Sequence, residues 1–376
     1  MRILGNEYNR MEFAGAFGDL GTFIPFVAAY ITLNKMDPLG ILVAFGIFKI
    51  FVGFYFKTPM PIQPMKAIGG MAIAHPESIS HGMIWGSGIF TAAFWLIMGL
   101  TGAVSWLHKI TSKPIFRGIM LGLGLSFVVE GVKMMGNQPI AAVIALGITF
   151  YLLPYEKIPA MLILLAFGVG VAVISTPSLV SEIIQISARF RLPEVSLNRV
   201  SWQDLVAGSL ILGFPQAPLT LGNAIIGTAE ENNELFPDRK TNVKTIAVDH
   251  GFMNLVSTAI GGIPLCHGAG GMAGHVRFGA RTGGALVILG IIVLVLGLFF
   301  SDSVAMIFKF FPPSILGVIL FFTGLELASM IRDIGSKRSD VYIMLVTAGL
   351  AMWNMGVAFL AGVVLYYGVE KKVLKL

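Results

Sequence analysis

Two stretches far apart in the sequence place helix-breaking residues and hydrogen-bond donors in apolar surroundings. Residues 59–66 read PMPIQPMK, and residues 263–271 read IPLCHGAGG. Each stretch runs into the same four letters, GGMA, at 69–72 and at 270–273. A proline such as Pro64 fits the first turn of a helix, where its missing N–H needs no partner. The pattern predicts two short helices, each beginning just after a break.

The start of a helix binds anions, because its first N–H groups are free and the helix dipole is positive there. Two such starts facing one point inside a membrane would make an anion site. Lys66 lies close to the first start, and a lysine at membrane depth is costly and usually functional. We expect Lys66 either to bind the anion or to balance the charge of Asp19.

Further neutral donors follow on one face of a later helix, since Gln216 and Thr220 lie one turn apart with Asn223 beyond them. They could bind ligand oxygens or join helices. The predicted substrate-binding residues combine this face with the two breaks: Gln63, Pro64, Met65, Lys66, Gln216, Thr220, His267, Gly268, Ala269 and Gly270.

Other charged residues in apolar segments have more than one interpretation. Asp19, inside GAFGDLGTFIP, would repel an anion unless it is protonated or paired, so it is the candidate for proton coupling. The alternative is that Asp19 caps backbone or pairs with Lys66. Lys49 could extend to the cytoplasmic surface. Glu130 and Glu326 could be interface residues, gate contacts or coupling groups.

The residue patterns do not predict an enzyme, a metal site or a cofactor. His267 directly follows Cys266, and neither H-E-x-x-H nor paired Cys-x-x-Cys motifs occur. We expect His267 to donate at the helix start instead. Asp249 and His250 are adjacent, so on a helix they point about 100° apart and do not form a catalytic pair.

The elements that position these residues must be membrane helices. The chain has 376 residues, of which 56% are hydrophobic and 12% charged, whereas soluble domains average about 25% charged. One cysteine excludes an internal disulfide framework. Basic residues here set topology rather than bind nucleic acid. Spans are predicted near 12–34, 37–56, 62–76, 82–107, 114–135, 138–153, 159–176, 202–228, 243–262, 265–280, 283–301, 303–330, 339–353 and 354–370.

The order of these fourteen segments predicts topology. Most Lys and Arg residues between spans, including Lys157 and Lys375, fall on the side that holds the N-terminus. This bias favours an even number of spans with both termini in the cytoplasm. The stretch 177–201 is amphipathic and is expected to lie along the membrane interface as a connector.

An internal repeat is the more informative signal. KPIFRGIML at 113–121 resembles PPSILGVIL at 312–320, and FGDLGT at 17–22 resembles FPQAPLT at 214–220, at an offset of roughly 200 residues that the two breaks share. Seven spans per half is odd, so the second copy (202–376) is inverted relative to the first (1–176). Inverted repeats with broken helices at matching positions are typical of secondary transporters with a midplane site.

These residues also carry a family resemblance that covers nearly the whole chain. The sequence closely resembles the molybdate transporter type 1 family, a branch of the sulfate permease superfamily that lacks the cytoplasmic STAS domain. CHGAGG is the most specific motif. The matching segments are FGDLGTFIP at 17–25, PMPIQPMKA at 59–67, QAPLT at 216–220, PLCHGAGGMAG at 264–274 and RFGARTG at 277–283.

The resemblance implies an all-α fold of seven-plus-seven inverted repeats, shared with uracil permease-like carriers. It implies a core of spans 1–4 and 8–11 and a gate of spans 5–7 and 12–14. Substrate is expected between discontinuous helices 3 and 10, and the family commonly forms homodimers. We therefore expect a plasma-membrane importer of a tetrahedral oxyanion, working by alternating access and proton coupling.

Molybdate is the first candidate substrate, with tungstate and sulfate as further possibilities. Two alternatives stay open: a proton-coupled nucleobase or organic-anion carrier, and an anion channel of the same fold. A nucleobase carrier would need stacking aromatics and paired carboxylates at the site. The expected partners are the oxyanion, the lipid bilayer and a second copy of the chain, without nucleic acid.

Overall fold

The computed structural model describes every residue except 156–157, 333, 336 and 375–376. Lys157 and Lys375, which the topology argument used, lie outside the described residues. Within the described part, six helices are long and apolar enough to cross a membrane, or up to eight if each of two bent helix pairs counts as one span. The all-helical polytopic prediction is confirmed, whereas the number of fourteen spans stays a prediction.

The first half of the chain supplies ten helices among the described residues: α1 (Arg10–Ala16), α2 (Leu20–Thr32), α3 (Pro38–Phe56), α4 (Lys66–Ala74), α5 (His81–Leu100), α6 (Ala103–Ile110), α7 (Lys113–Met135), α8 (Pro139–Leu152), α9 (Ala160–Ser175) and α10 (Ser178–Ile184). The second half supplies ten described α-helices besides short 3-10 and π-helical segments: α11 (Trp202–Ala207), α12 (Phe214–Leu219), α13 (Thr228–Leu235), α14 (Val243–Ala259), α15 (Ala269–Arg277), α16 (Gly284–Phe300), α17 (Val304–Phe308), α18 (Pro313–Ala328), α19 (Arg338–Trp353) and α20 (Met355–Glu370).

Several helices begin where the sequence carries a start signal. Pro38, Pro114, Pro139 and Pro313 each fall in the first turn of a helix, where the missing N–H has no cost. The side chain of Asp37 also caps α3 by accepting from Leu39 N at 3.0 Å. Prolines at these positions therefore act as helix starts and not as kinks.

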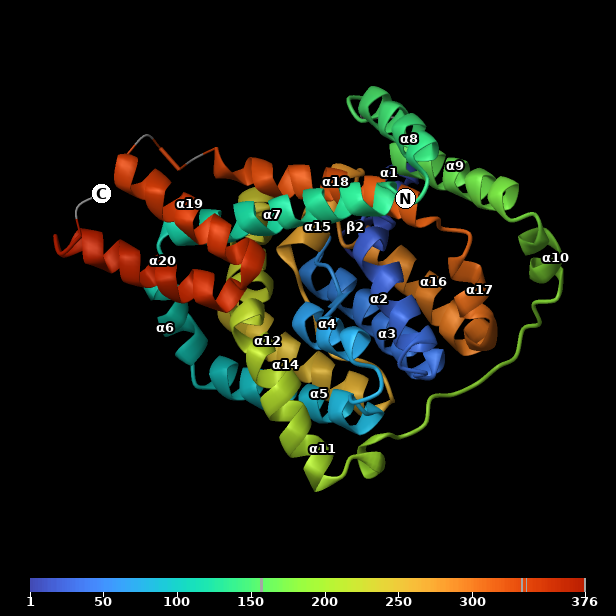
Figure 1. Cartoon of the computed structure of the whole chain (residues 1–376), viewed down its shortest axis with the longest axis horizontal. Helices are drawn as coiled ribbons and strands as arrows, with labels where there is room; N and C mark the ends of the chain where they lie inside the picture. The colour runs from blue at the N-terminus through green and yellow to red at the C-terminus, as the bar shows by residue number, and fades with distance from the viewer. Residues whose placement is uncertain (156–157, 333, 336, 375–376) are drawn as a thin grey trace.

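The long helices pack in pairs, and one of these pairs, α7 with α18, joins the two segments whose sequences repeat at 113–121 and 312–320. The most extensive contacts join α7 to α18, α3 to α16 and α5 to α14, and Figure 1 shows α7 and α18 side by side. Glycines permit this approach: a Cβ on Gly131 would lie 2.6 Å from Gly317 O, and one on Gly317 would lie 2.6 Å from Gly131 O. Small residues at such crossings let membrane helices pack closely.

The two predicted breaks lie against each other as paired strands. β3 (Gln63–Pro64) and β4 (Leu265–Cys266) are antiparallel, with Gln63 opposite Cys266 and Pro64 opposite Leu265. The chain is thus not helical through either break, as predicted. β1 (Arg2–Ile3) and β2 (Asn6–Glu7) form the other described strand pair, near the N-terminus.

Pro64 does not lie in the first turn of α4, and this part of the prediction was wrong. The helix begins at Lys66 with Met65 as N-cap. Met65 N donates to Pro264 O at 3.0 Å, which holds the chain in the strand pair for longer than its local sequence suggests. Proline tolerates a place in a short strand because it needs no donor partner.

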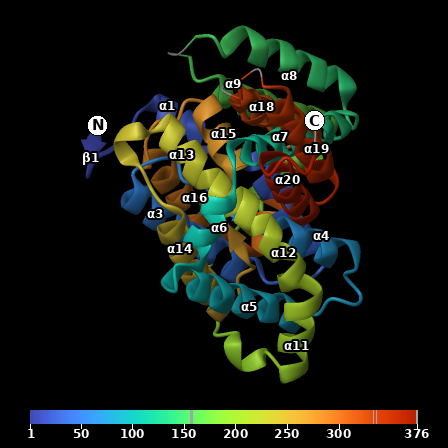
Figure 2. The ribbon, with the colours of Figure 1, turned by 90° about the vertical axis from the view of Figure 1, so that its left-hand side faces the viewer.

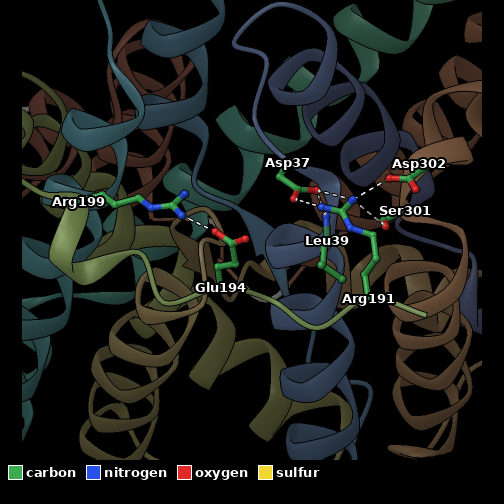
Figure 3. Close-up of polar contacts among 7 residues, drawn as sticks. All are labelled: Asp37, Leu39, Arg191, Glu194, Arg199, Ser301 and Asp302. Carbon is green, nitrogen blue, oxygen red and sulfur yellow. Dashed lines mark hydrogen bonds and ion pairs between the residues drawn. The ribbon is translucent and has the colours of Figure 1, made fainter. Parts of the chain in front are cut away.

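The connector between the halves is fastened to one face of the bundle. After α10 the chain runs extended toward α11, which lies at the opposite end from α8 (Figures 1 and 2). Arg191 bridges two carboxylates, with Nη2 2.6 Å from Asp37 Oδ2 and Nη1 2.7 Å from Asp302 Oδ1 (Figure 3). Arg199 pairs with Glu194 further along the connector. Arg191 thereby ties the start of α3 to the region that follows α16.

Candidate functional site

The strand pair sets the direction of the two short helices that follow it. The β3–β4 strand pair, residues 63–64 and 265–266, is called the crossing below. Because its strands are antiparallel, α4 and α15 leave it in opposite directions. The N-cap residues, Met65 and Gly268, make no side-chain capping bond. Both helices therefore direct their first N–H groups toward the same region, as an anion site requires.

Lys66 is the first residue of α4, and its ammonium group has no hydrogen-bond partner in the described part of the chain. Nζ is buried and lies 4.1 Å from the centroid of the Phe127 ring. No ion-pair contact joins Lys66 to Asp19 among the described residues, but the two charges still attract each other through space, so Lys66 remains a partial counter-charge for Asp19. A buried charge without a paired partner is costly, which leaves Lys66 free to bind an anion.

Asp19 lies at the bend between α1 and α2 and binds Gln63 across the break. Its Oδ1 accepts from Gln63 Nε2 at 2.6 Å and from Thr22 Oγ1, while its buried Oδ2 has no hydrogen-bond partner among the residues that the structure describes. The carboxylate makes no capping bond to α2. Asp19 therefore does not act as the backbone cap, and it meets the charge of Lys66 only through space.

Gln63 in turn lies against the start of α15. A Cβ on Gly268 would collide with Gln63 Oε1, and one on Gly271 would lie 2.8 Å from Gln63 Nε2. Glycine is required at both positions because the amide approaches the backbone this closely. The CHGAGG motif thus has a packing reason as well as its place at a helix start.

Gln216 reaches the other helix start and caps it. Its Oε1 accepts from Ala67 N at 2.8 Å and from Ile68 N at 3.3 Å, and its Nε2 donates to Thr220 Oγ1 at 3.0 Å. The helix that carries Gln216 is flanked by π-helical segments at 208–213 and 220–227, and such segments are frequent at functional sites. Gln216 and Thr220 therefore both lie at the start of α4. Gln216 caps the helix, and Thr220 holds the Gln216 amide in place.

His267 is part of the crossing and points away from the start of α15. Its Nδ1 lies 2.9 Å from Pro61 O and its Nε2 lies 2.8 Å from Asp249 Oδ2. Both ring nitrogens are engaged, so His267 does not donate at the helix start as expected. It joins the first break to α14.

Asp249 is a site residue that the sequence analysis missed. We judged it only against its neighbour His250, whereas its partner is His267, which is distant in sequence. Asn254, on the same helix, binds both the N–H and the C=O of Leu265 at 2.8 Å. Buried polar residues along an otherwise apolar span were the signal for this supporting face.

Lys49 supports the first break and does not extend to a surface. Its side chain is fully buried, and Nζ donates to Ile62 O at 2.8 Å. The unpaired carbonyl that a broken helix leaves in the membrane needs such a donor. The expectation that Lys49 extends to the cytoplasmic surface was wrong for this reason.

Phe127 of α7 is the second residue that the sequence analysis missed. Its ring lies over Lys66 Nζ, and a Cβ on Gly270 would collide with the same ring. An aromatic residue in an apolar helix carries no signal of such a position.

The two glutamates whose role the sequence left open have different partners. Glu130 pairs with Lys133 at 3.4 Å on α7, while Glu326 pairs with Arg277 at 3.4 Å and joins α18 to α15.

Among the residues that the structure describes, no group of three or more His, Cys, Asp or Glu side chains is placed to hold a metal ion. Two short helices that start from paired strands inside a bundle of apolar helices instead define a membrane transporter with a broken-helix site.

Comparisons with known proteins identify the family. A family model described as "Molybdate transporter of MFS superfamily" matches residues 11–127 and 208–327. Molybdate transporter 2 of Arabidopsis thaliana is 34% identical, covering 94% of this chain and 86% of the relative. Molybdate transporter 1 of the same plant is 31% identical, covering 94% and 87%. The chain belongs to this molybdate transporter family and is a multi-pass membrane transporter, not an enzyme.

Solved structures share the fold. The transmembrane domain of the cyanobacterial bicarbonate transporter BicA aligns with a TM-score of 0.59 at 16% identity, covering 94% of this chain and 96% of that one. The murine anion transporter Slc26a9 in its inward-facing state aligns with a TM-score of 0.60 at 14% identity, covering 100% and 70%. The predicted inverted-repeat transporter fold is thereby confirmed, while the count of seven spans in each half stays a prediction.

Proposed function

We propose that this protein imports a tetrahedral oxyanion, with molybdate as the first candidate and tungstate and sulfate as the others. The observation that carries the proposal is the buried ammonium of Lys66, which has no hydrogen-bond partner at the start of α4. The relatives named as molybdate transporters support the choice of anion. A doubly charged oxyanion would supply the charge and the acceptors that this position lacks.

In this proposal the anion binds between the two helix starts. Lys66 provides the charge, and the first turn of α15 provides N–H donors at Ala269 and Gly270, whereas Met65 N is already bound to Pro264 O. An oxyanion that reaches Ala67 N must replace the Gln216 oxygen now bound there. The crossing is formed in part by Gln63, Pro64, His267 and Gly268. Beside it lie Gln216 and Thr220.

We further propose a core of spans 1–4 and 8–11 that moves against a gate of spans 5–7 and 12–14, giving alternating access. Asp19 is the proposed proton carrier, because one of its buried oxygens has no partner. The proposed setting is a homodimer in the plasma membrane with both termini in the cytoplasm.

Titration of the purified protein with sodium molybdate, tungstate, sulfate and uracil, followed by calorimetry or thermal shift, tests the function. We expect binding of at least one oxyanion and none of uracil. Lys66→Ala should weaken oxyanion binding by roughly tenfold or more, the range of a lost charge-assisted hydrogen bond. Lys133→Ala, on an exposed lysine of α7, is the control. Uracil binding, or oxyanion affinity unchanged in Lys66→Ala, would overturn the proposal.

Saturation separates a carrier from a channel of the same fold. In proteoliposomes we expect oxyanion uptake to saturate with concentration, whereas an ohmic current would indicate a channel.

A further inference from the structure

The position between the two helix starts is filled by a side chain from a third helix. Phe127 of α7 is only 6% exposed, and its ring lies over Lys66 Nζ with 4.1 Å between the nitrogen and the ring centroid. The same ring occupies the space next to Gly270, where a Cβ would collide with it. One aromatic ring thus contacts the first residue of α4 and the first turn of α15.

The contact is a cation–π interaction in a place without competing hydrogen bonds. Among the described residues, Lys66 Nζ is buried without a hydrogen-bond partner, so the negative face of the Phe127 ring compensates its charge by direct contact, while Asp19 attracts it only through space. Lys49, the other buried lysine near the breaks, also lies near aromatic rings, but it already donates to Ile62 O. Lys66 therefore depends on Phe127 in a way that Lys49 does not depend on its rings.

The contact between Phe127 and Lys66 joins the two parts of the molecule that we propose to move against each other. Lys66 and Gly270 belong to the helices that we assign to the core, whereas α7 packs along α18 in the part that we assign to the gate. Within α7, Phe127 faces Gly324 of α18, because a Cβ there would lie 2.9 Å from Phe127 Cβ. The gate helices thus hold the ring against the core.

We propose that Phe127 is an internal stand-in for the substrate: its ring occupies the anion position and satisfies Lys66 when the carrier is empty, and the oxyanion replaces it. This inference rests on the proposed oxyanion transport. Its consequence is that the empty carrier can bring core and gate together without an uncompensated charge. In the loaded carrier the anion takes the place of the ring and compensates Lys66, so core and gate can again come together.

Phe127→Leu tests the inference, because it removes the π face and keeps an apolar side chain. With no ring to displace, molybdate should bind roughly 5- to 30-fold more tightly, the equivalent of a desolvated cation–π contact of about 1–2 kcal/mol. Phe127→Tyr keeps the ring face and should bind like the wild type. Phe322→Leu removes a fully buried phenylalanine of α18 that packs on Phe150, and it serves as the matched control.

Two transport assays in proteoliposomes separate this role from a merely structural one. Exchange of molybdate across the membrane uses only the loaded carrier, and Phe127→Leu should keep it within about twofold of wild type. Net uptake also needs the empty carrier to return, and it should fall at least tenfold in Phe127→Leu. Phe322→Leu should change both assays in parallel or neither.

The outcomes also distinguish the two proposals. If the wild type binds no oxyanion, the proposed function fails. If the wild type binds molybdate but Phe127→Leu binds it equally or more weakly, or loses exchange together with net uptake, the stand-in role of Phe127 is wrong while the proposed function is retained.

Discussion

At the scale of single residues, the buried charges near the crossing differ in what satisfies them. Lys49 donates to a backbone carbonyl, and Asp19 accepts from the Gln63 amide, so both help to hold the broken chain in place. Lys66 makes no hydrogen bond among the described residues, and its charge is met by the ring of Phe127 and by the through-space attraction of Asp19. Because an incompletely compensated buried charge is costly, Lys66 is the residue with most to gain from a ligand.

The second oxygen of Asp19 leads to a prediction about pH. Oδ2 is buried without a partner, so a proton placed there would remove a charge next to the anion site. Asp19→Asn keeps the shape and cannot change its charge. We expect it to flatten the pH dependence of molybdate uptake, measured in proteoliposomes under an imposed proton gradient. Glu77→Gln, at an exposed position after α4, is the control. A pH profile that matches wild type would remove Asp19 from proton coupling.

At the scale of elements, the half-helix α4 is stabilised by a residue of another helix. Gln216 binds two of its first N–H groups, the role that a local Ser, Thr, Asn or Asp plays in most helices. An anion at this helix start would use the same donors. The cap and the substrate therefore compete for one position on α4.

Because of this competition, Gln216→Ala should lower the Tm of the ligand-free protein and increase the rise in Tm that molybdate causes. Loss of a cap costs about 0.5–2 kcal/mol, so the ligand-free Tm should fall. Molybdate can then take the vacated N–H groups, so the rise in Tm that it causes should exceed that of the wild type. Gln185→Ala, an exposed glutamine of the connector, should change neither quantity. A smaller rise than in the wild type would make Gln216 a direct ligand.

At the scale of the whole molecule, an ion pair joins the two proposed moving parts at one end. Arg117 of α7, in the proposed gate, binds Glu234 of α13, in the proposed core, at 2.7 Å. His108 of α6 binds Glu230 of α13 at 2.7 Å within the core side. These side chains line a cavity of about 680 Å³. If α7 moves against α13 during transport, the Arg117–Glu234 pair must separate.

Glu234→Gln should therefore change the rate of transport and leave binding unaltered. Glu234 is partly exposed, and such pairs contribute about 0.2–1 kcal/mol, which corresponds to a change of roughly up to fivefold in the maximal uptake rate. The Kd for molybdate, which binds elsewhere, should stay the same. Glu182→Gln, which removes an exposed pair with Lys309, provides the comparison. A changed Kd with an unchanged rate would contradict the assigned movement.

The sequence by itself determined the class of the protein and the place of its site. Composition required membrane helices, and the prolines and glycines at residues 59–64 and 261–264 required breaks that lipid cannot solvate. The repeat at a common offset required an inverted fold. These conclusions depend on local properties of the chain, and the paired strands and half-helices at both breaks agree with them.

The tertiary structure alone decided what each side chain of the site contacts. The sequence did not predict that Gln216 would cap α4, that His267 would turn to Asp249, or that Phe127 would cover Lys66. Each contact joins residues more than about fifteen positions apart, where the helical period carries no information. Such partners are chosen by how the helices pack, and that depends on the whole set of crossings rather than on any one stretch.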